Sequence, residues 1–135
     1  MIPFRLSFEP GASLCEQLVY AAKKAVISGQ MQPGEPFPSV RSLSKALKIN
    51  PNTAHKAVTQ LLAEGLIEVR PGLGTFIAEP RASTASERGN LLKKELEQLV
   101  VEARKLGLQL EDVTDAVARH WSRLSGTEDR PGRKE

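Results

Sequence analysis

The sequence predicts an α+β fold in which helices predominate: three helices and a β-hairpin, followed by two further helices. Three observations support this prediction. Residues that commonly cap helices precede runs of apolar residues spaced three or four positions apart. Glycines follow those runs, where a chain leaves a helix. Two short segments rich in β-forming residues flank a turn that contains two glycines.

The first helix is predicted over about residues 13–28. Before it, apolar residues alternate within residues 1–12, which indicates a short extended arm or an edge strand. Ser13 and Glu16 have the spacing of a capping box, and Gly29 marks the end of the helix. The positions expected to face the core are Leu14, Leu18, Ala22, Ala25 and Val26.

Two shorter helices follow a proline-rich connection at residues 32–38. Ser39 is expected to cap a helix over residues 39–47, and Asn50 to cap another over residues 51–64. Pro51 suits the first helical position, where no amide donor is needed, and Gly65 marks the end of that helix. The residues expected to face inward are Val40, Leu43, Leu47, Ala54, Ala57, Val58 and Leu61.

A β-hairpin is predicted from strands at residues 66–70 and 75–78. Gly72 and Gly74 in the connecting turn supply residues that tolerate positive φ. Two helices around a short turn, followed by a hairpin, is the order of a winged helix-turn-helix. We therefore expect such a domain over residues 1–79.

The remaining residues predict a linker at 80–86, two helices at about 87–106 and 110–124, and a charged, disordered tail at 125–135. Each helix carries a long apolar stripe. The stripes either pack back on the winged domain or form an interface, and an exposed apolar patch of this size favours an interface. We therefore expect a two-helix dimerisation region over 87–124, with interface residues Leu92, Leu96, Leu99, Leu106, Val113, Val117 and Trp121.

Composition narrows the classes of function. The net charge of +3 and the pI of about 9.2 permit nucleic-acid binding without proving it. Cys15 is the only cysteine and is expected to be a partly buried bystander, while the two histidines lie far apart. We expect no metal, no cofactor, no secretory signal, no membrane span and a cytoplasmic location. No acid–base pair near a nucleophile and no phosphate-binding loop supports an enzyme.

Several blocks of residues resemble the DNA-binding domain of the gluconate-repressor (GntR) family of bacterial regulators. In order, they are Ile27-Ser28-Gly29, Pro33-Gly34-Glu35, Pro38-Ser39-Val40-Arg41, Asn52-Thr53, Glu64-Gly65-Leu66-Ile67 and Gly72-Leu73-Gly74-Thr75-Phe76. The short C-terminal region, and Ile49-Asn50-Pro51-Asn52-Thr53 at the turn, resemble the YtrA subfamily. The likeness covers about residues 4–124. It implies a homodimer built by the two C-terminal helices and repression of nearby genes, often genes for transporters.

This resemblance and the motif geometry select a set of candidate DNA contacts. Arg41 is expected to reach a guanine edge or a phosphate, unless it pairs with Glu35. Amide groups at the start of helix 51–64 favour a phosphate. Relatives commonly carry arginine where this chain has Pro51, and often where it has His55. The full set is Ser39, Arg41, Asn50, Asn52, Thr53, His55, Lys56, Arg70 and Gly72.

For two of these candidates a structural role competes with DNA contact. Asn50 is expected chiefly as a helix cap, and Gly72 serves the hairpin turn. Arg70 flanks that turn, from which its side chain can reach a phosphate. The expected function is sequence-specific binding of double-stranded DNA by a homodimeric repressor at a pseudo-palindromic operator. Protein or RNA contacts made by a winged-helix module are the alternative. A small-molecule effector is left open.

Overall fold

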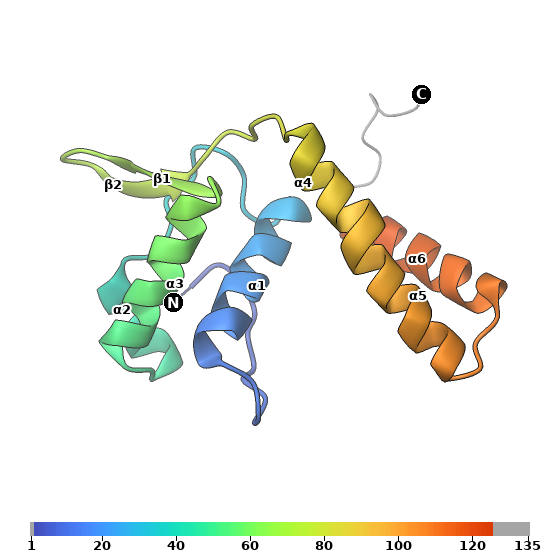
Figure 1. Ribbon diagram of the computed structural model, residues 1–135. Coiled ribbons are helices and arrows are strands. Elements are labelled where there is room, and N and C mark those ends of the chain that lie inside the picture. Colours follow the sequence, from blue (N-terminus) through green and yellow to red (C-terminus); the bar gives the residue numbers. More distant parts are fainter. Residues whose placement is uncertain (1, 126–135) are drawn as a thin grey trace. The chain divides into compact units, whose positions relative to one another are not determined.

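The computed structural model describes residues 2–125, and residues 2–80 form one compact unit within it (Figure 1). This unit contains α1 (Leu14–Ile27), α2 (Val40–Leu47), α3 (Pro51–Ala63), β1 (Ile67–Arg70) and β2 (Gly74–Ile77). The predicted mainly helical α+β fold with a two-stranded wing is confirmed. Of the tail predicted at 125–135, residues 126–135 lie outside the described residues.

The helices of this unit begin where the sequence predicts, because a side chain accepts a backbone hydrogen bond at each start. The Ser13 hydroxyl accepts from the N–H of Glu16 at 3.1 Å, and the Ser39 hydroxyl accepts from the N–H of Ser42 at 3.1 Å. The side-chain oxygen of Asn50 accepts from the next residue but one, at 2.7 Å. These bonds satisfy amides that have no partner within the helix.

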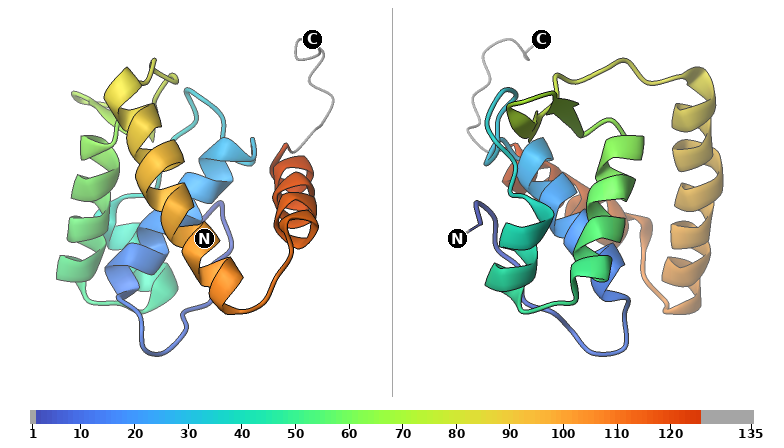
Figure 2. Two further views of the ribbon diagram at one scale, coloured as in Figure 1. Left: turned by 45° about the vertical axis from the view of Figure 1, so that its right-hand side comes forward. Right: turned by 90° about the vertical axis from the view of Figure 1, so that its left-hand side faces the viewer.

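The core lies where α1 and α2 pack against α3 (Figures 1 and 2). Ala54 and Ala57 are fully buried on α3, and their small side chains allow the helices to approach closely. Val19 is buried, whereas Leu14 is 40% exposed, so the buried face of α1 lies further round the helix than predicted. The core contains Phe4, Leu18, Val19, Ala22, Ala25, Met31, Phe37, Leu43, Ile49, Ala54, Ala57, Leu61, Ile67 and Ile77.

Strands β1 and β2 form an antiparallel hairpin in which Ile67 faces Ile77 and Arg70 faces Gly74. The connection that precedes α2 runs along the other edge of β2. The Ile77 N–H donates to the carbonyl of Glu35 at 2.8 Å, and the Phe37 N–H donates to the carbonyl of Thr75 at 2.8 Å. Backbone hydrogen bonds therefore join the wing to the segment that leads into α2.

The N-terminal arm is extended, but residues 2–12 form no strand. The arm is held by side chains instead. Phe4 is buried and stacks on Phe37, with ring centroids 6.2 Å apart and 11° between the ring planes. The amide of Gln17 accepts from the N–H of Glu9 at 2.8 Å and donates to its carbonyl at 3.0 Å. Aromatic packing thus replaces the predicted alternative of an edge strand.

Residues 81–123 form a second compact unit. It contains α4 (Ala85–Gly89), the π-helix η1 (Asn90–Glu95) and α5 (Leu96–Lys105), which follow one another without a break, and α6 begins after a turn (Leu110–Leu124). The first helical run starts two residues before the predicted residue 87, because Thr84 and Glu87 form a capping box. Ala103 is the one buried hydrophobic residue of this unit within the described chain.

Candidate nucleic-acid interface

A tight turn fixes the angle between α2 and α3. Lys48 ends α2 in a left-handed backbone conformation, with φ of 57°, and Ile49 is buried. The hydroxyl of Ser44 donates to the carbonyl of Ile49 at 2.7 Å, and the Ile49 N–H donates back to the carbonyl of Ser44 at 3.2 Å. Reciprocal hydrogen bonds across the turn therefore join the two helices of the motif.

The outward face of α3 carries the polar residues that the sequence selected. Asn52, His55 and Lys56 are exposed, and Thr53 is half-buried. The opposite face buries Leu61 together with the two core alanines of this helix. Because that inward face packs on α1 and α2, the polar face is available to enter a DNA groove.

The start of α3 does not offer free amides to a phosphate, contrary to expectation. Pro51 has no N–H, and the Asn52 N–H donates to the side chain of Asn50. The N–H groups of Thr53 and Ala54 donate to the carbonyl of Asn50, at 2.9 and 3.1 Å. Asn50 is a cap, and its side-chain oxygen is occupied. A phosphate at this end of the helix must therefore be bound by side chains.

The start of α2 differs from that of α3. Within residues 2–125, the N–H groups of Val40 and Arg41 have no acceptor, and the Arg41 side chain is exposed. The alternative ion pair of Arg41 with Glu35 is absent from the described residues, where the Glu35 carboxylate accepts from the N–H of Gln32 at 3.1 Å. The hydroxyl of Ser39 is engaged in capping. Arg41 and two backbone donors are thus free for an anion.

The segment that contains α2 and α3 carries basic residues and no acidic ones. Residues 36–63 include Arg41, Lys45, Lys48 and Lys56 but no aspartate or glutamate in 28 positions. Arg41, Lys45 and Lys48 are exposed. Arg41 and Lys45 are four residues apart and so lie on one face of α2, and Lys48 follows at the end of that helix. The set of DNA contacts predicted from the sequence did not include Lys45 and Lys48. The absence of acidic residues from 36–63 is the signal in the sequence that points to them. We call Arg41, Lys45 and Lys48 the basic stripe.

The wing presents a nearly uncharged tip. Gly72 and Gly74 have φ of 77° and 121°, and an added Cβ meets no atom within 4 Å at either position. The turn therefore needs glycine for its backbone conformation and not for space. Arg70 is not fully free, because its Nε lies 2.9 Å from the Glu68 carboxylate and its guanidinium lies 4.5 Å from the Phe76 ring centroid.

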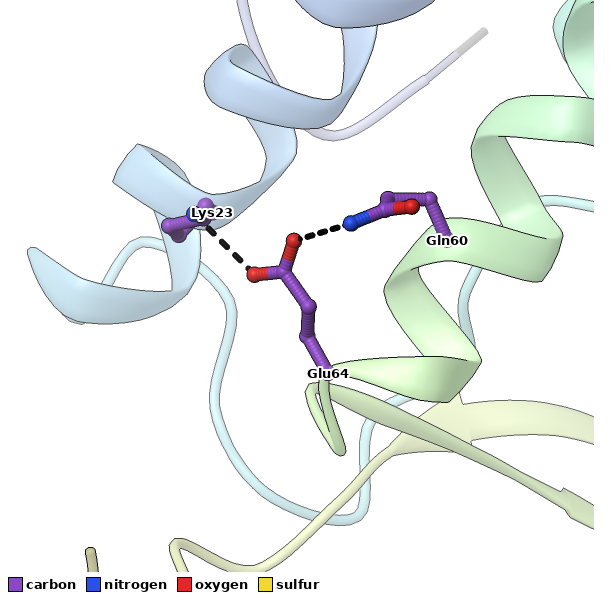
Figure 3. A network of polar contacts seen from close by, with 3 residues as sticks. All are labelled: Lys23, Gln60 and Glu64. Carbon is purple, nitrogen blue, oxygen red and sulfur yellow. Dashed lines mark hydrogen bonds and ion pairs between the residues drawn. The ribbon is translucent and has the colours of Figure 1, made fainter. Parts of the chain in front are cut away.

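A polar network at the end of α3 ties this helix to α1 (Figure 3). Glu64 accepts a hydrogen bond from the Gln60 amide at 2.6 Å and forms an ion pair with Lys23 at 3.0 Å. The Gln60 hydrogen bond is the main cause that lowers the pKa of Glu64, Lys23 lowers it further, and partial burial opposes both. The network thus links the end of the helix that carries the polar face to α1.

Other kinds of site find little support in the part of the chain that the structure describes. Within residues 2–125, no three or more His, Cys, Asp or Glu side chains gather closely enough to hold a metal ion. None of the helices in these residues is both long and apolar enough to cross a membrane.

Residues 8–77 match the family model described as bacterial regulatory proteins, gntR family, and this match spans more than half of the chain. The chain belongs to the GntR family. It is thus a DNA-binding transcriptional regulator. The matched residues include α1, the α2–α3 motif and both strands of the wing, so the predicted family is confirmed.

Similar bacterial regulators cover more of the chain than the family model does. The chain is 37% identical over 109 residues to the HTH-type transcriptional repressor YtrA of Bacillus subtilis, covering 78% of this chain and 84% of the relative. A second Bacillus subtilis relative, the HTH-type regulator YhcF, is 30% identical, with 77% and 83% of the two chains covered. The predicted likeness to YtrA is therefore confirmed.

Solved structures share this fold. A transcriptional antiterminator from Listeria monocytogenes superposes with a TM-score of 0.81 at 25% identity, covering 90% of this chain and 93% of that chain. A transcriptional regulator from Oenococcus oeni has a TM-score of 0.59 at 32% identity, with 86% and 97% covered. The fold of this GntR-family chain is thus shared by proteins of similar length.

Proposed function

We propose that this GntR-family regulator represses genes near its own by binding, as a homodimer, to a pseudo-palindromic operator. The observation that carries the proposal is the acid-free run of residues 36–63, which contains both the exposed basic stripe and the polar outward face of α3. Helix α3 enters the major groove and the wing contacts the adjacent minor groove. We propose that the protein binds DNA and catalyses no reaction. We also propose that it acts in the cytoplasm.

The contacts divide by chemistry. Arg41 and Lys56 are long and cationic, so they bind phosphate or a guanine edge. Asn52, Thr53 and His55 project from the first turns of α3, where short polar side chains read base edges; a side-chain amide pairs with adenine in this way. Four proposed contacts remain, next to the motif or in the wing, and we propose that each binds the DNA backbone more weakly than Arg41 and Lys56 do: Ser39, Asn50, Arg70 and Gly72.

Dimerisation is proposed for the helical region over residues 87–124, joined to the winged domain of residues 1–79 by the linker at 80–86. A stable monomer seldom leaves so many large apolar side chains in water. Trp121 is 71% exposed and Leu106 is 66% exposed in the single chain. A second copy of the chain covers the stripes, and the proposed interface residues are Leu92, Leu96, Leu99, Leu106, Val113, Val117 and Trp121.

The test is a binding titration of the purified chain against DNA from upstream of its own gene and the neighbouring genes. Footprinting should show two protected half-sites whose centres lie about one helical turn, roughly 34–36 Å, apart. Random duplex DNA and single-stranded RNA of the same length serve as controls. Tight binding to the RNA without preference for promoter DNA would reject the proposal in favour of the RNA-binding alternative.

Repression is tested separately from binding. A reporter gene placed behind the footprinted promoter should be silent when the chain is present and active when its gene is deleted. A reporter that becomes less active on deletion would identify an activator and would contradict the repressor role, while leaving the DNA contacts intact.

A further inference from the structure

One residue of the α2–α3 turn breaks a rule that the rest of the described chain follows. Within residues 2–125, eight residues have positive φ, and seven of them are glycines. The chain leaves α1, α3 and α5 through Gly29, Gly65 and Gly107, with φ of 85°, 77° and 80°. It leaves α2 through Lys48, with φ of 57°. Left-handed backbone is strained for any residue with a Cβ, and glycine is the usual choice.

The turn leaves Lys48 no relaxed alternative. On one side, its N–H donates to the carbonyl of Ser44, which also accepts the N–H of Ile49. On the other side, Ile49 is buried in the core, and Asn50 must be extended to cap α3. The backbone conformation at position 48 is therefore imposed by both helices, whatever residue stands there.

Neither packing nor an ion pair of its side chain explains why a lysine stands at position 48. It is exposed, and within residues 2–125 it makes no ion pair. It is the member of the basic stripe that lies in the turn, two residues before Asn50, the cap of α3. A cation at this place adjoins the helix that enters the groove, where the DNA backbone passes on either side.

We propose that Lys48 is a phosphate-contacting residue, and that the chain tolerates a strained backbone at this turn in order to place a positive charge beside α3. The inference rests on the proposed binding of a dimer to DNA. It adds a residue that the sequence-based set of contacts did not contain. It also makes an unusual prediction, since the same substitution should improve folding and impair binding.

The test is Lys48→Gly in the full chain. Relief of strain exceeds the extra freedom of glycine in the unfolded chain, so the melting temperature should rise by about 4 °C. Loss of one phosphate contact per protomer should reduce the slope of log K against log salt by about 1.8 for the dimer. At 0.15 M salt the same loss corresponds to about 30-fold weaker operator binding.

Two control variants isolate the position. Lys48→Arg keeps the charge and the Cβ, so both the melting temperature and the salt slope should stay near those of the unmodified chain. Lys24→Gln removes an exposed charge from α1, outside the acid-free run, and should leave the salt slope unchanged.

Each opposite outcome is informative. An unchanged salt slope for Lys48→Gly would overturn the phosphate contact, and a lowered melting temperature would overturn the strain argument. Failure of the proposed function is distinguishable, because the unmodified chain would then show no preference for promoter DNA over random duplex. The salt slope measured on random duplex still decides the role of Lys48 in that case.

Discussion

Replacing Val117 by aspartate tests the proposed dimer most directly. Val117 lies at the middle of the α6 stripe, between Val113 and Trp121, and is 47% exposed in the single chain. The substitution leaves α6 free to form, because position 117 faces water in the monomer. It places a carboxylate where the proposal places a second copy of the chain.

The size of the effect follows from the exposure of this side chain. Full burial of a valine side chain contributes about 2 kcal/mol, and about half remains to be gained on dimerisation, about 1 kcal/mol. Burying an unpaired carboxylate adds a penalty of about 2 kcal/mol or more. A two-fold interface repeats both effects, giving about 6 kcal/mol, which raises the dimer dissociation constant about 10⁴-fold.

Sedimentation velocity between about 1 and 100 μM is the assay, with mass compared to the 14.7 kDa of one chain. The unmodified chain should sediment as a dimer, and Val117→Asp as a monomer. Tyr20→Asp is the matched control, because Tyr20 is 61% exposed on α1 in the other unit. If Val117→Asp sedimented as a dimer throughout this range, the reasoning that assigns the α6 stripe to the interface would be refuted.

Three further predictions concern DNA affinity, acid stability and the wing. Arg41→Ala should weaken operator binding at least tenfold in an anisotropy titration, about 1.4 kcal/mol or more. Arg41→Lys, which keeps the charge, should keep the salt dependence of binding. An unchanged affinity of Arg41→Ala for the operator would exclude the proposed docking. Because the pKa of Glu64 is lowered from 4.5, its charge stabilises the fold above that pH and ceases to do so as the pH falls through the folded-state value. Glu64→Gln should therefore reduce the free energy of unfolding by about 0.5 kcal/mol at pH 7, with the difference vanishing in acid; a loss that persisted at pH 2 would contradict this. Gly72→Val should lower the melting temperature by several degrees, since valine is strained at φ of 77°, whereas Leu73→Ala at the exposed tip should not.

The sequence predicted most accurately those features that depend on neighbouring residues. Ser13, Ser39 and Asn50 cap their helices as expected, and Gly65 leaves α3 with positive φ. Such contacts span two or three residues, so a local pattern contains all the information needed. The same holds for the polar outward face of α3, which the spacing of Ala54, Ala57 and Leu61 determines.

Contacts with distant partners and the details of local backbone geometry both escaped prediction. Phe4 stacks on Phe37, which lies far along the chain, and nothing in residues 1–12 indicates that contact. The π-helix at Asn90–Glu95 has no propensity signal of its own. The occupied amides at the start of α3 follow from the backbone of the turn. Arg70 contacts Glu68, two residues before it on the same face of β1, and Phe76, which lies opposite Glu68 on β2.

The pairing of residues 34–37 with β2 has a consequence for solubility. An open strand edge is a template for strands of other molecules and so promotes aggregation. Glu35 and Phe37 occupy that edge of β2 through backbone hydrogen bonds. The outer edge of β1 remains, but this strand is four residues long and carries Glu68 and Arg70. Copies of the protein crowded on neighbouring DNA sites therefore have little opportunity to join wing to wing.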